Sequence, residues 1–445
     1  MFKRKIQLQL EVWKNSENRK PLVVKGIRQC GKTTAVKHFA ETHYENTVYI
    51  DFHEQDDIIS LFDGPLTVDN LTTIISAALP TARFVPHKTC LIFDEIQECP
   101  RARGALKFFR QDGRYDVICT GSLLGVSGYK TSVQQQRENN ASIPVGSEEY
   151  IKMFPMDFEE WLWANGINDN VIDLLRLYFQ NEEPVPQALH TTLRRLLLEY
   201  VVVGGMPEVV QRFIDTHDIN QTLSLQKAIL QGYKADMIKY APQQSQPYIH
   251  QCFDSIPRQL AKENGKFQYS VVRLGGRSSQ YEGSLQWIED AGIINRCHNM
   301  SITELPLDGN AIDSEFKIYM EDTGLFVAML EPGTQADILR GSMLTYKGAM
   351  FENFVAGTFS KMGRRLYYFR KESGLELDFI IRYKGACIPV ECKATSGKAQ
   401  SLRTILKHPE KYHITSAIKL GDYNIGRQEK LLTLPLYMTF LLTDL

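Results

Sequence analysis

A glycine-rich stretch near the N-terminus has the residue types and spacing of a phosphate-binding loop. Residues 26–34 read G-x-x-x-x-G-K-T-T, in which the glycines allow a tight turn and the backbone N–H groups can surround a phosphate. In such a loop Lys32 reaches the β- and γ-phosphates of a nucleotide, and the Thr33 hydroxyl is a ligand of Mg²⁺. The predicted nucleotide-binding residues are Gly26, Arg28, Gln29, Cys30, Gly31, Lys32, Thr33 and Thr34.

Two adjacent carboxylates are the usual companions of such a loop. Asp94 and Glu95 close an apolar run at residues 89–95, which is typical of a parallel strand buried on both faces. An aspartate in that position can hold Mg²⁺, and the adjacent glutamate can polarise an attacking water. The next strand-like run ends in Thr-Gly-Ser, and we expect the Ser122 hydroxyl to lie between these carboxylates and a γ-phosphate. The alternatives are a chance glycine turn and strands that end in solvated polar groups; the two motifs together favour a nucleotide site.

Nucleotide hydrolysis also needs positive charge opposite the γ-phosphate. Several arginines lie in or near these motifs, and the sequence does not single out one of them. The candidates are Arg28, Arg101, Arg103, Arg114 and Arg137.

A second group of charged residues lies near the C-terminus in the pattern D-x(12)-E-x-K. Asp378 stands in an apolar strand-like run, and Glu391 and Lys393 end the next one, with Glu352 on a preceding helix. Alternation along a strand places Glu391 and Lys393 on one face. Two carboxylates on neighbouring strands can hold a metal that activates water, and the lysine can stabilise charge on a scissile phosphate. The alternative is a solvated Glu–Lys pair on an edge strand.

The residues predicted to do chemistry thus form two sets. The predicted catalytic residues are Glu95, Ser122, Glu352, Asp378, Glu391 and Lys393, and the predicted metal ligands are Thr33, Asp94, Asp378 and Glu391.

The elements around the first set alternate as in an α/β layer. Apolar runs predict strands and amphipathic stretches predict helices, and a polar, glutamine-rich segment at 126–142 predicts a mobile loop on the nucleotide side. The expected strands are residues 21–25, 47–52, 89–95 and 115–120, and the expected helices are 35–40, 66–79 and 103–109.

The rest of the chain divides into three further segments. We expect a P-loop domain with a parallel sheet at 1–160 and a helical lid at 161–245. Residues 246–340 follow the helix–turn–helix–wing order of a winged helix, with a helix at 280–291. Residues 341–445 predict one helix, three strands and a further helix, an α/β arrangement like that of restriction endonucleases.

The bulk composition is that of an ordinary globular chain. Of the 445 residues, 43% are hydrophobic and 23% are charged, and the net charge of −1 gives no global attraction to nucleic acid. The eight cysteines are scattered without a C-x-x-C pair, which favours a reducing cytoplasm over a disulfide framework. No stretch reaches the ~20 apolar residues of a membrane span.

Taken together, these motifs resemble one family: bacterial and archaeal P-loop ATPases of the AAA superclass that end in a PD-(D/E)XK nuclease-like domain. The resemblance implies ATP binding and hydrolysis with Mg²⁺, a helical lid, a winged helix and a nuclease-like C-terminal domain. One departure is the acidic sequence at 146–149, where many relatives carry a basic residue. The matching segments are 26–34, FDEIQ at 93–97, TGS at 120–122, FPMDFEE at 154–160, GGMPE at 204–208, EDAGII at 289–294, KIYMEDTGL at 317–325, KGAMFEN at 347–353, ELDF at 376–379 and PVECK at 389–393.

Three functions follow as hypotheses. The first is an ATP-driven switch that acts on DNA, and the second adds a metal-dependent nuclease at the C-terminal site. The third is a signalling or scaffold NTPase whose C-terminal domain binds protein partners. Glu282, Glu289 and Asp290 on the candidate recognition helix count against a phosphate-tracking role. No membrane partner is expected, and the sequence does not predict the oligomeric state.

Overall fold

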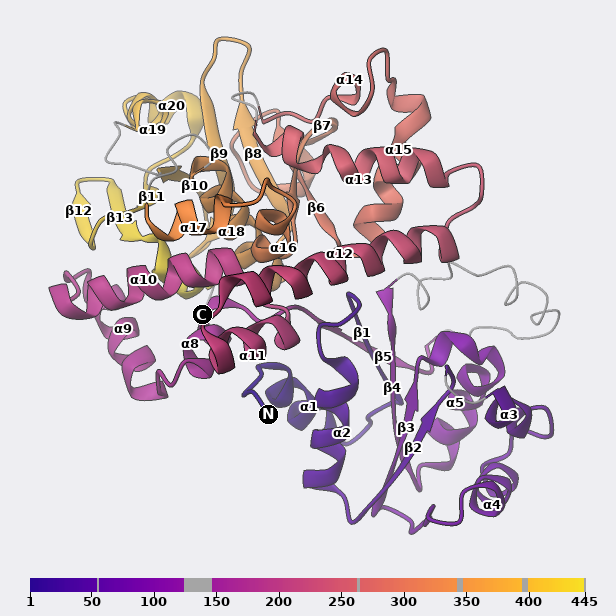
Figure 1. Ribbon diagram of the computed structural model, residues 1–445. Coiled ribbons are helices and arrows are strands. Elements are labelled where there is room, and N and C mark those ends of the chain that lie inside the picture. Colours follow the sequence, from indigo (N-terminus) through magenta and orange to yellow (C-terminus); the bar gives the residue numbers. More distant parts are fainter. Residues whose placement is uncertain (54–55, 124–145, 262–264, 342–346, 394–398, 444–445) are drawn as a thin grey trace. The chain divides into compact units, whose positions relative to one another are not determined.

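The computed structural model describes residues 1–53, 56–123, 146–261, 265–341, 347–393 and 399–443. The chain forms two compact units, each built around a β-sheet (Figure 1). Apart from the first two residues, the first unit comprises residues 3–154 and 235–244, and the second comprises 155–234 and 245–445.

The first unit contains a parallel sheet with the strand order β2-β3-β4-β1-β5. Because the strands are parallel, their carboxyl ends meet at one edge of the sheet, where ligands of open α/β sheets bind. Strand β4 lies between β1 and β3, so its carboxyl end lies between the ends of the strands that carry the phosphate loop and Asp94. The strands are β1 (Leu22–Gly26), β2 (Asn46–Asp51), β3 (Thr89–Asp94), β4 (Asp116–Ser122) and β5 (Glu149–Met153).

Helices cover both faces of this sheet. Helix α2 packs against β1, β3 and β4, with α1 beside it, while α5 packs against β4 and α4 on the other side (Figure 1). The face beneath α4 and α5 is stabilised by edge-to-face contacts among Phe52, Phe62, Phe93 and Phe109. The helices are α1 (Ile6–Lys14), α2 (Lys32–His43), α3 (Asp56–Ile59), α4 (Val68–Ala78) and α5 (Pro100–Asp112).

The second unit begins with a helical region. Helix α8 starts with a capping box, in which Asp157 accepts from the Glu160 N–H and the Glu160 carboxylate accepts from the Asp157 N–H. Helix α12 begins in the second unit, and its residues from 235 onward belong to the first. The helices are α8 (Phe158–Ala164), α9 (Asp169–Asn181), α10 (Gln187–Val203), α11 (Pro207–Thr216), α12 (Ile219–Tyr240), α13 (Gln246–Leu260), α14 (Tyr269–Val272), α15 (Ser278–Asp290), α16 (Thr323–Ala328), α17 (Thr334–Leu339), α18 (Lys347–Lys361), α19 (Gln400–Leu406) and α20 (Pro409–Tyr412).

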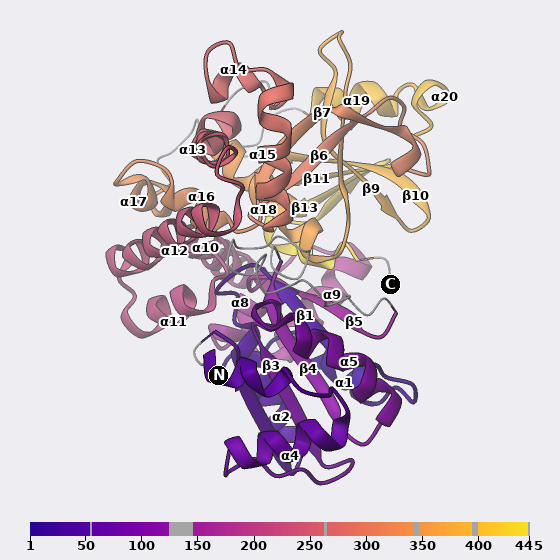
Figure 2. The ribbon, with the colours of Figure 1, turned by 90° about the vertical axis from the view of Figure 1, so that its right-hand side faces the viewer.

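An eight-stranded mixed sheet forms the centre of the second unit, in the order β12-β13-β11-β10-β9-β8-β6-β7 (Figure 2). The hairpin β6–β7 follows α15 as a wing would, yet β6 also pairs in parallel with β8. The predicted wing and the predicted C-terminal strands therefore share one sheet. The strands are β6 (Ile294–Met300), β7 (Ala311–Met320), β8 (Leu366–Arg370), β9 (Glu376–Tyr383), β10 (Ala386–Lys393), β11 (Ala417–Gly421), β12 (Gly426–Gln428) and β13 (Leu431–Pro435).

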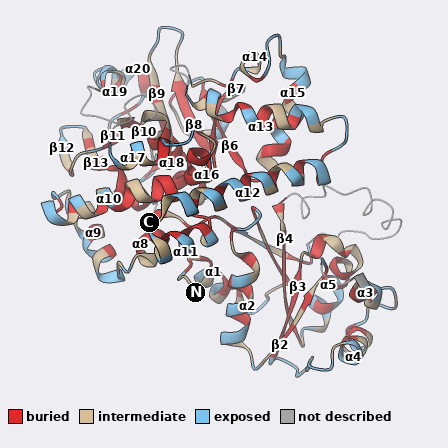
Figure 3. Ribbon diagram, in the orientation of Figure 1, coloured by how far each residue is buried: buried red, intermediate tan, exposed pale blue. Residues whose placement is uncertain are grey.

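Helices α16 and α18 are almost wholly buried in this unit, as Figure 3 shows. The two glycine motifs of the sequence meet at α16. The Asp322 carboxylate accepts from the Gly205 N–H at 2.7 Å and from the Leu325 N–H at 2.9 Å. A Cβ atom on Gly324 would lie 2.4 Å from the Gly204 nitrogen. The GGMPE and EDTGL segments thus have a packing role.

The sequence predicted most of these elements. The α/β class and the parallel N-terminal sheet are confirmed, and the four predicted strands of that sheet correspond to β1–β4. The predicted glutamine-rich loop at 126–142, which includes Arg137, lies outside the described residues. Among the described residues, no helix is long and apolar enough to cross a membrane.

Candidate functional sites

The phosphate loop joins β1 to α2 in a cradle-like turn. Gln29 (φ 65°) and Gly31 (φ 93°) have left-handed backbone conformations, and α2 begins directly afterwards at Lys32. The Lys32 side chain is buried and donates to the carbonyl oxygens of Gly26 at 3.2 Å and Ile27 at 3.1 Å. Backbone N–H groups and the positive end of the α2 dipole thus surround one point, which is the arrangement that binds phosphate.

The Asp94 carboxylate, at the end of β3, is the centre of a hydroxyl network. Thr33, the second residue of α2, donates to Asp94 Oδ1 at 3.1 Å, and Thr120 of β4 also donates to Oδ1. Tyr49 of β2 lies 2.8 Å from Asp94 Oδ2 and 3.1 Å from Asp51 Oδ2. Hydroxyl groups from three elements therefore fix an almost fully buried carboxylate.

The other predicted catalytic residues of this site stand at the same sheet edge. Glu95 has a left-handed backbone (φ 52°), and the side-chain amide of Gln97 donates to its carboxylate. Ser122 is the last residue of β4 and is paired in register with Gly26 at the start of the phosphate loop. The geometry thus brings Glu95 and Ser122 to the loop's edge of the sheet, as the sequence predicts.

Three of the candidate arginines have structural partners. Arg101 donates to backbone carbonyl oxygens of residues 62–64, and Arg114 pairs with Asp112 and Asp69. Arg103 is buried and pairs with Glu148 at 2.7 Å. This pair also accounts for one acidic residue of the 146–149 segment.

Arg28 has a different environment, because its side chain extends from the phosphate loop and is 52% exposed. It pairs with Asp236, which belongs to the part of α12 that lies in the first unit. The same end of α12 meets Glu98: Lys239 lies 3.6 Å and the Tyr240 hydroxyl 3.4 Å from that carboxylate. Of the candidate arginines in the described part of the chain, Arg28 is the one on the loop itself.

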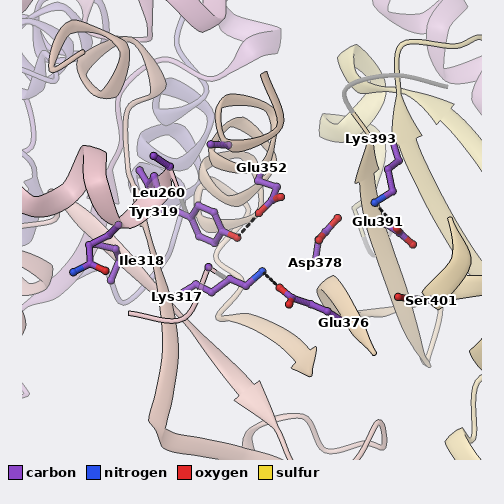
Figure 4. Close-up of a pocket in the computed structure, with 14 residues that line it drawn as sticks. Leu260, Lys317, Ile318, Tyr319, Glu352, Glu376, Asp378, Glu391, Lys393 and Ser401 are labelled. Atoms are coloured by element: carbon purple, nitrogen blue, oxygen red, sulfur yellow. Dashed lines mark hydrogen bonds and ion pairs between the residues drawn. The ribbon is translucent and has the colours of Figure 1, made fainter. Parts of the chain in front are cut away.

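The C-terminal residues gather around a cavity of about 350 Å³ in the second unit (Figure 4). All four predicted residues of this site line it, together with two charged residues that the sequence analysis did not select. The charged lining residues are Lys317, Glu352, Glu376, Asp378, Glu391 and Lys393.

Antiparallel pairing of β9 and β10 brings two of the carboxylates together. Val390 pairs with Phe379, so the next residues along, Glu391 and Asp378, are neighbours across the two strands. The Cys392 N–H donates to Asp378 Oδ2 at 2.8 Å, and Lys393 pairs with Glu391 Oε1 at 2.5 Å. The spacing D-x(12)-E-x-K is therefore the spacing of a hairpin.

Glu352 and Lys317 approach Asp378 from other elements. Glu352 projects from α18 and accepts from the Tyr319 hydroxyl at 3.0 Å. Lys317 projects from β7, is only 5% exposed and pairs with Glu376 at 2.6 Å. In Figure 4, Asp378 lies between the Lys317–Glu376 pair and the Glu391–Lys393 pair.

Burial and mutual repulsion shift the ionisation of this cluster. Burial raises the pKa of Glu352 to about 7, with a further contribution from Asp378 that Lys317 opposes. Burial also raises the pKa of Asp378, which Lys317 and Lys393 oppose only in part. Burial and the charge of Asp378 raise the pKa of Glu391, and Lys393 partly opposes them. Burial alone lowers the pKa of Lys317, but the charges of Glu352, Glu376 and Asp378 outweigh it and raise that pKa.

The chemistry of these donors fits a cation held by two carboxylates. Glu391 is 4% exposed, and among the described residues its Oε2 atom has no hydrogen-bond partner. Within the same part of the chain, no group of three or more His, Cys, Asp or Glu side chains is arranged to hold a metal ion. Mg²⁺ needs only one or two carboxylates beside its waters, so Asp378 and Glu391 can suffice.

The residues that the sequence analysis missed are those whose role depends on tertiary contacts. Tyr49 lies two residues before Asp51, and strand alternation alone places both on one face of β2. Lys317 lies in the apolar, buried end of β7, between Phe316 and Ile318, and a lysine in such a place is a signal for a buried ion pair. Thr120 was part of a quoted motif, but the predicted role was given to Ser122.

Three family models match parts of the chain. Residues 18–162 match an AAA domain. Residues 194–336 and 347–437 match two domains of unknown function, DUF8612 and DUF4143. No curated protein matches the sequence significantly.

Several solved structures are distantly similar. The Walker-type ATPase PABY2304 of Pyrococcus abyssi has 14% identity and a TM-score of 0.41, over 74% of this chain and 96% of that one. The ORC1 protein of Aeropyrum pernix, solved in complex with DNA, has 10% identity and a TM-score of 0.27, over 77% and 93%. PCH-2 of C. elegans has 12% identity and a TM-score of 0.27, over 48% and 64%. The segment that is similar to an AAA domain, residues 18–162, contains Asp94 and has the sheet and the loop of a phosphate site.

Proposed function

We propose that this protein binds ATP with Mg²⁺, hydrolyses it, and uses the nucleotide state to control its second unit. The observation that carries the proposal is the Asp94 network, in which a loop threonine and a strand-end carboxylate already lie 3.1 Å apart. That pair supplies the protein ligands that P-loop NTPases use for Mg²⁺.

Each residue of the loop's edge then has a role. Lys32 and the loop N–H groups would bind the phosphates, and Thr33 and Asp94 would hold the Mg²⁺ ion that neutralises phosphate charge. Glu95 orients and polarises the attacking water, and Ser122 contacts the γ-phosphate. Arg28, which lies on the loop with a 52% exposed side chain, supplies positive charge toward the developing negative charge.

Helix α12 is a continuous element through which the nucleotide site of the first unit can influence the second unit. It runs without interruption from Ile219 in the second unit to Tyr240 in the first. At its end, Asp236 pairs with the loop residue Arg28. We propose that nucleotide binding draws Arg28 away from Asp236 and thereby changes how α12 is held.

DNA is the partner that we propose for the second unit, through α15. Two of the three acidic residues that argued against this role, Glu282 and Glu289, share an ion pair with the buried Arg296, and Asp290 accepts from the Gln286 side-chain amide. The most exposed residues of α15 itself are uncharged, although the Glu282 side chain is also 46% exposed. The turn before the helix is basic and carries Leu274, which is 96% exposed. The exposed residues are Arg273, Leu274, Gly275, Arg277, Ser278, Ser279, Gln280, Gly283 and Gln286.

The experiment for this surface is the salt dependence of DNA binding by the full chain. Phosphate contacts make log K fall linearly with log salt concentration. The double change Arg273→Ala/Arg277→Ala should reduce that slope by about 1 to 2, whereas Arg365→Ala, at an exposed arginine paired with Asp308, should not. No DNA binding at any salt concentration would instead favour the signalling or scaffold function with protein partners.

A second candidate function is metal-dependent cleavage of nucleic acid at the C-terminal cavity. The unpartnered Oε2 of Glu391 beside Asp378 favours a cation there, which would activate water, and Lys393 is placed to neutralise a phosphate oxygen. The test is cleavage of DNA and RNA with Mg²⁺ or Mn²⁺ by the wild type and by Lys393→Ala. Equal cleavage by both proteins, or none by the wild type, would dispose of this function.

The nucleotide proposal itself is tested by ATP binding. Lys32→Ala should weaken Mg-ATP binding at least tenfold, because it removes a buried cation from the phosphates. The matched control is Lys88→Ala, at an exposed lysine of the same unit that pairs with Glu45. Unchanged affinity in Lys32→Ala would refute the proposal.

A further inference from the structure

The Lys317 ammonium lies inside the carboxylate cavity, although this residue is outside the D-x(12)-E-x-K pattern. It comes from β7, at the edge of the sheet, and reaches Glu376 at 2.6 Å. Tyr368 flanks it, with the ammonium 5.0 Å from the ring centroid. A Cβ atom on Gly265 would approach its side chain to 2.9 Å, so the backbone there packs closely on the lysine.

The charges around the cavity are divided between two sides. Four carboxylates and two lysines line it, which leaves a formal charge of −2. Lys317 lies on the side of Glu352 and Glu376, while the other side contains Glu391 with its unpartnered Oε2. Asp378 lies between them (Figure 4).

We propose that Lys317 is a fixed cation that occupies the Glu352–Glu376 side of the cavity, so that the site takes one divalent cation, between Asp378 and Glu391, instead of two. This inference rests on the proposed cation site. Its physical basis is that an ammonium ion satisfies the same carboxylates that a second divalent ion needs and repels any cation that approaches them. The formal charge of −2 is matched by a single divalent ion.

The direct test counts Mn²⁺ ions bound to the full chain without nucleotide, by electron paramagnetic resonance. The Glu391→Gln variant should bind one Mn²⁺ ion fewer than the wild type. In Lys317→Met the cavity should take a second Mn²⁺, or bind the first at least tenfold more tightly. Any Mn²⁺ at the phosphate loop is common to all these variants, so the differences report the C-terminal cavity.

Lys317→Met leaves three carboxylates without their counter-ion and is expected to lower the melting temperature. Added Mn²⁺ should restore that temperature, and by more than it stabilises the wild type. Lys361→Met is the matched control, because Lys361 is a partly buried lysine of the same unit that donates to the Tyr200 hydroxyl and the Met156 carbonyl. The Lys361→Met variant should have a lower melting temperature that added Mn²⁺ does not restore.

The double variant Lys317→Met/Glu376→Gln keeps the test informative if the single variant does not fold. It removes one positive and one negative charge together, and it should still gain Mn²⁺ at Glu352 and Asp378. If the wild type binds one ion that depends on Glu391 and both lysine variants bind it unchanged, the role of Lys317 is refuted while the cation site stands. If no ion depends on Glu391 in any variant, both proposals fail.

Discussion

At the scale of single residues, the central feature is the meeting of three hydroxyl groups at Asp94. Thr33, Tyr49 and Thr120 come from α2, β2 and β4 and hydrogen-bond to the same carboxylate. A carboxylate held from several sides keeps its orientation when a cation arrives, and such preorganisation strengthens binding. Tyr49 lies on β2, so its hydroxyl can be removed by substitution without changing any residue of the phosphate loop.

Tyr49→Phe should therefore raise the Mg²⁺ concentration that supports half-maximal ATP hydrolysis. The loss of a hydrogen bond to a charged group costs about 1–2 kcal/mol, or roughly five- to thirtyfold in Mg²⁺. Binding of ATP without Mg²⁺ should be unchanged. Tyr44→Phe is the control, since it removes a similar bond, to Asp116 at the opposite end of β4; equal effects in both variants would contradict the assigned role.

Glu352 gives the second prediction at this scale, which concerns stability and pH. Its pKa of about 7 in the folded chain exceeds the ordinary value of 4.5, so the folded chain keeps a proton that the unfolded chain releases between those values. The contribution of this proton to the stability of the folded chain is therefore full below about pH 4.5, and it is lost as the pH rises from there to about 7. Asp378 raises this pKa, while Lys317 and Tyr319 lower it.

Glu352→Gln should therefore be more stable than the wild type at pH 8, by about 1–3 kcal/mol, with little difference near pH 4.5. Urea unfolding in the presence of a chelator measures this difference. Glu372→Gln, at an exposed position of the same unit, is the control and should show no pH-dependent change. A destabilised Glu352→Gln protein at pH 8 would show that the carboxylate is held charged.

The sequence could predict the residues whose roles are set by local spacing. The phosphate loop and the Asp94–Glu95 pair need only a strand, a turn and a helix, and the spacing from Asp378 to Glu391 is that of a hairpin. Lys317 could not be assigned, because its place in the cavity depends on the pairing of β6 with β8. The pairing of strands that lie far apart in the sequence cannot be predicted from the hydrophobic pattern of either strand.

At the scale of elements, the close crossing of α10 and α16 explains a sequence motif that has no place in either site. The backbone of α16 approaches the end of α10 so closely that a Cβ atom on Gly324 would lie 2.4 Å from Val203 and Gly204. Asp322 joins the same two segments by accepting from the Gly205 N–H. Packing, not chemistry, therefore requires these glycines.

Gly324→Ala should destabilise the second unit by about 3 kcal/mol or more, because the clash is with backbone atoms that cannot rotate away. Gly283→Ala is the matched control. A Cβ atom on Gly283 meets nothing within 4 Å, and α15 should gain about 0.5–1 kcal/mol. Thermal unfolding measures both; a Gly324→Ala protein as stable as the wild type would refute the close crossing.

The end of α12 carries the other prediction about elements. Asp236 competes with the nucleotide for Arg28, so Asp236→Asn should release the arginine to the phosphates. Since the pair is partly exposed, we expect ATP affinity to rise by only about two- to tenfold. Asp254→Asn, which breaks a different α12 ion pair with Lys234, should leave ATP affinity unchanged. Weaker ATP binding in Asp236→Asn would contradict the competition.

At the scale of the whole molecule, the chain is a P-loop domain joined by one continuous helix to a unit with a single eight-stranded sheet. The sequence predicted four segments, and the last three belong largely to one compact unit. The structure has helices α13 and α15 and the hairpin β6–β7 in the expected order, and the winged-helix fold stays a prediction. The sequence did not predict that the strands of the last two segments form one sheet, because each segment's pattern is self-contained.

The central claim is that Glu95 activates water for ATP hydrolysis in a site held by Lys32 and Asp94. The most direct measurement is steady-state phosphate release at saturating Mg-ATP by the wild type and Glu95→Gln, with ATP binding measured on both. The claim predicts equal binding and a fall in turnover of about 100-fold or more in Glu95→Gln. Equal turnover in the two proteins, or no turnover by a wild type that binds Mg-ATP, would contradict it.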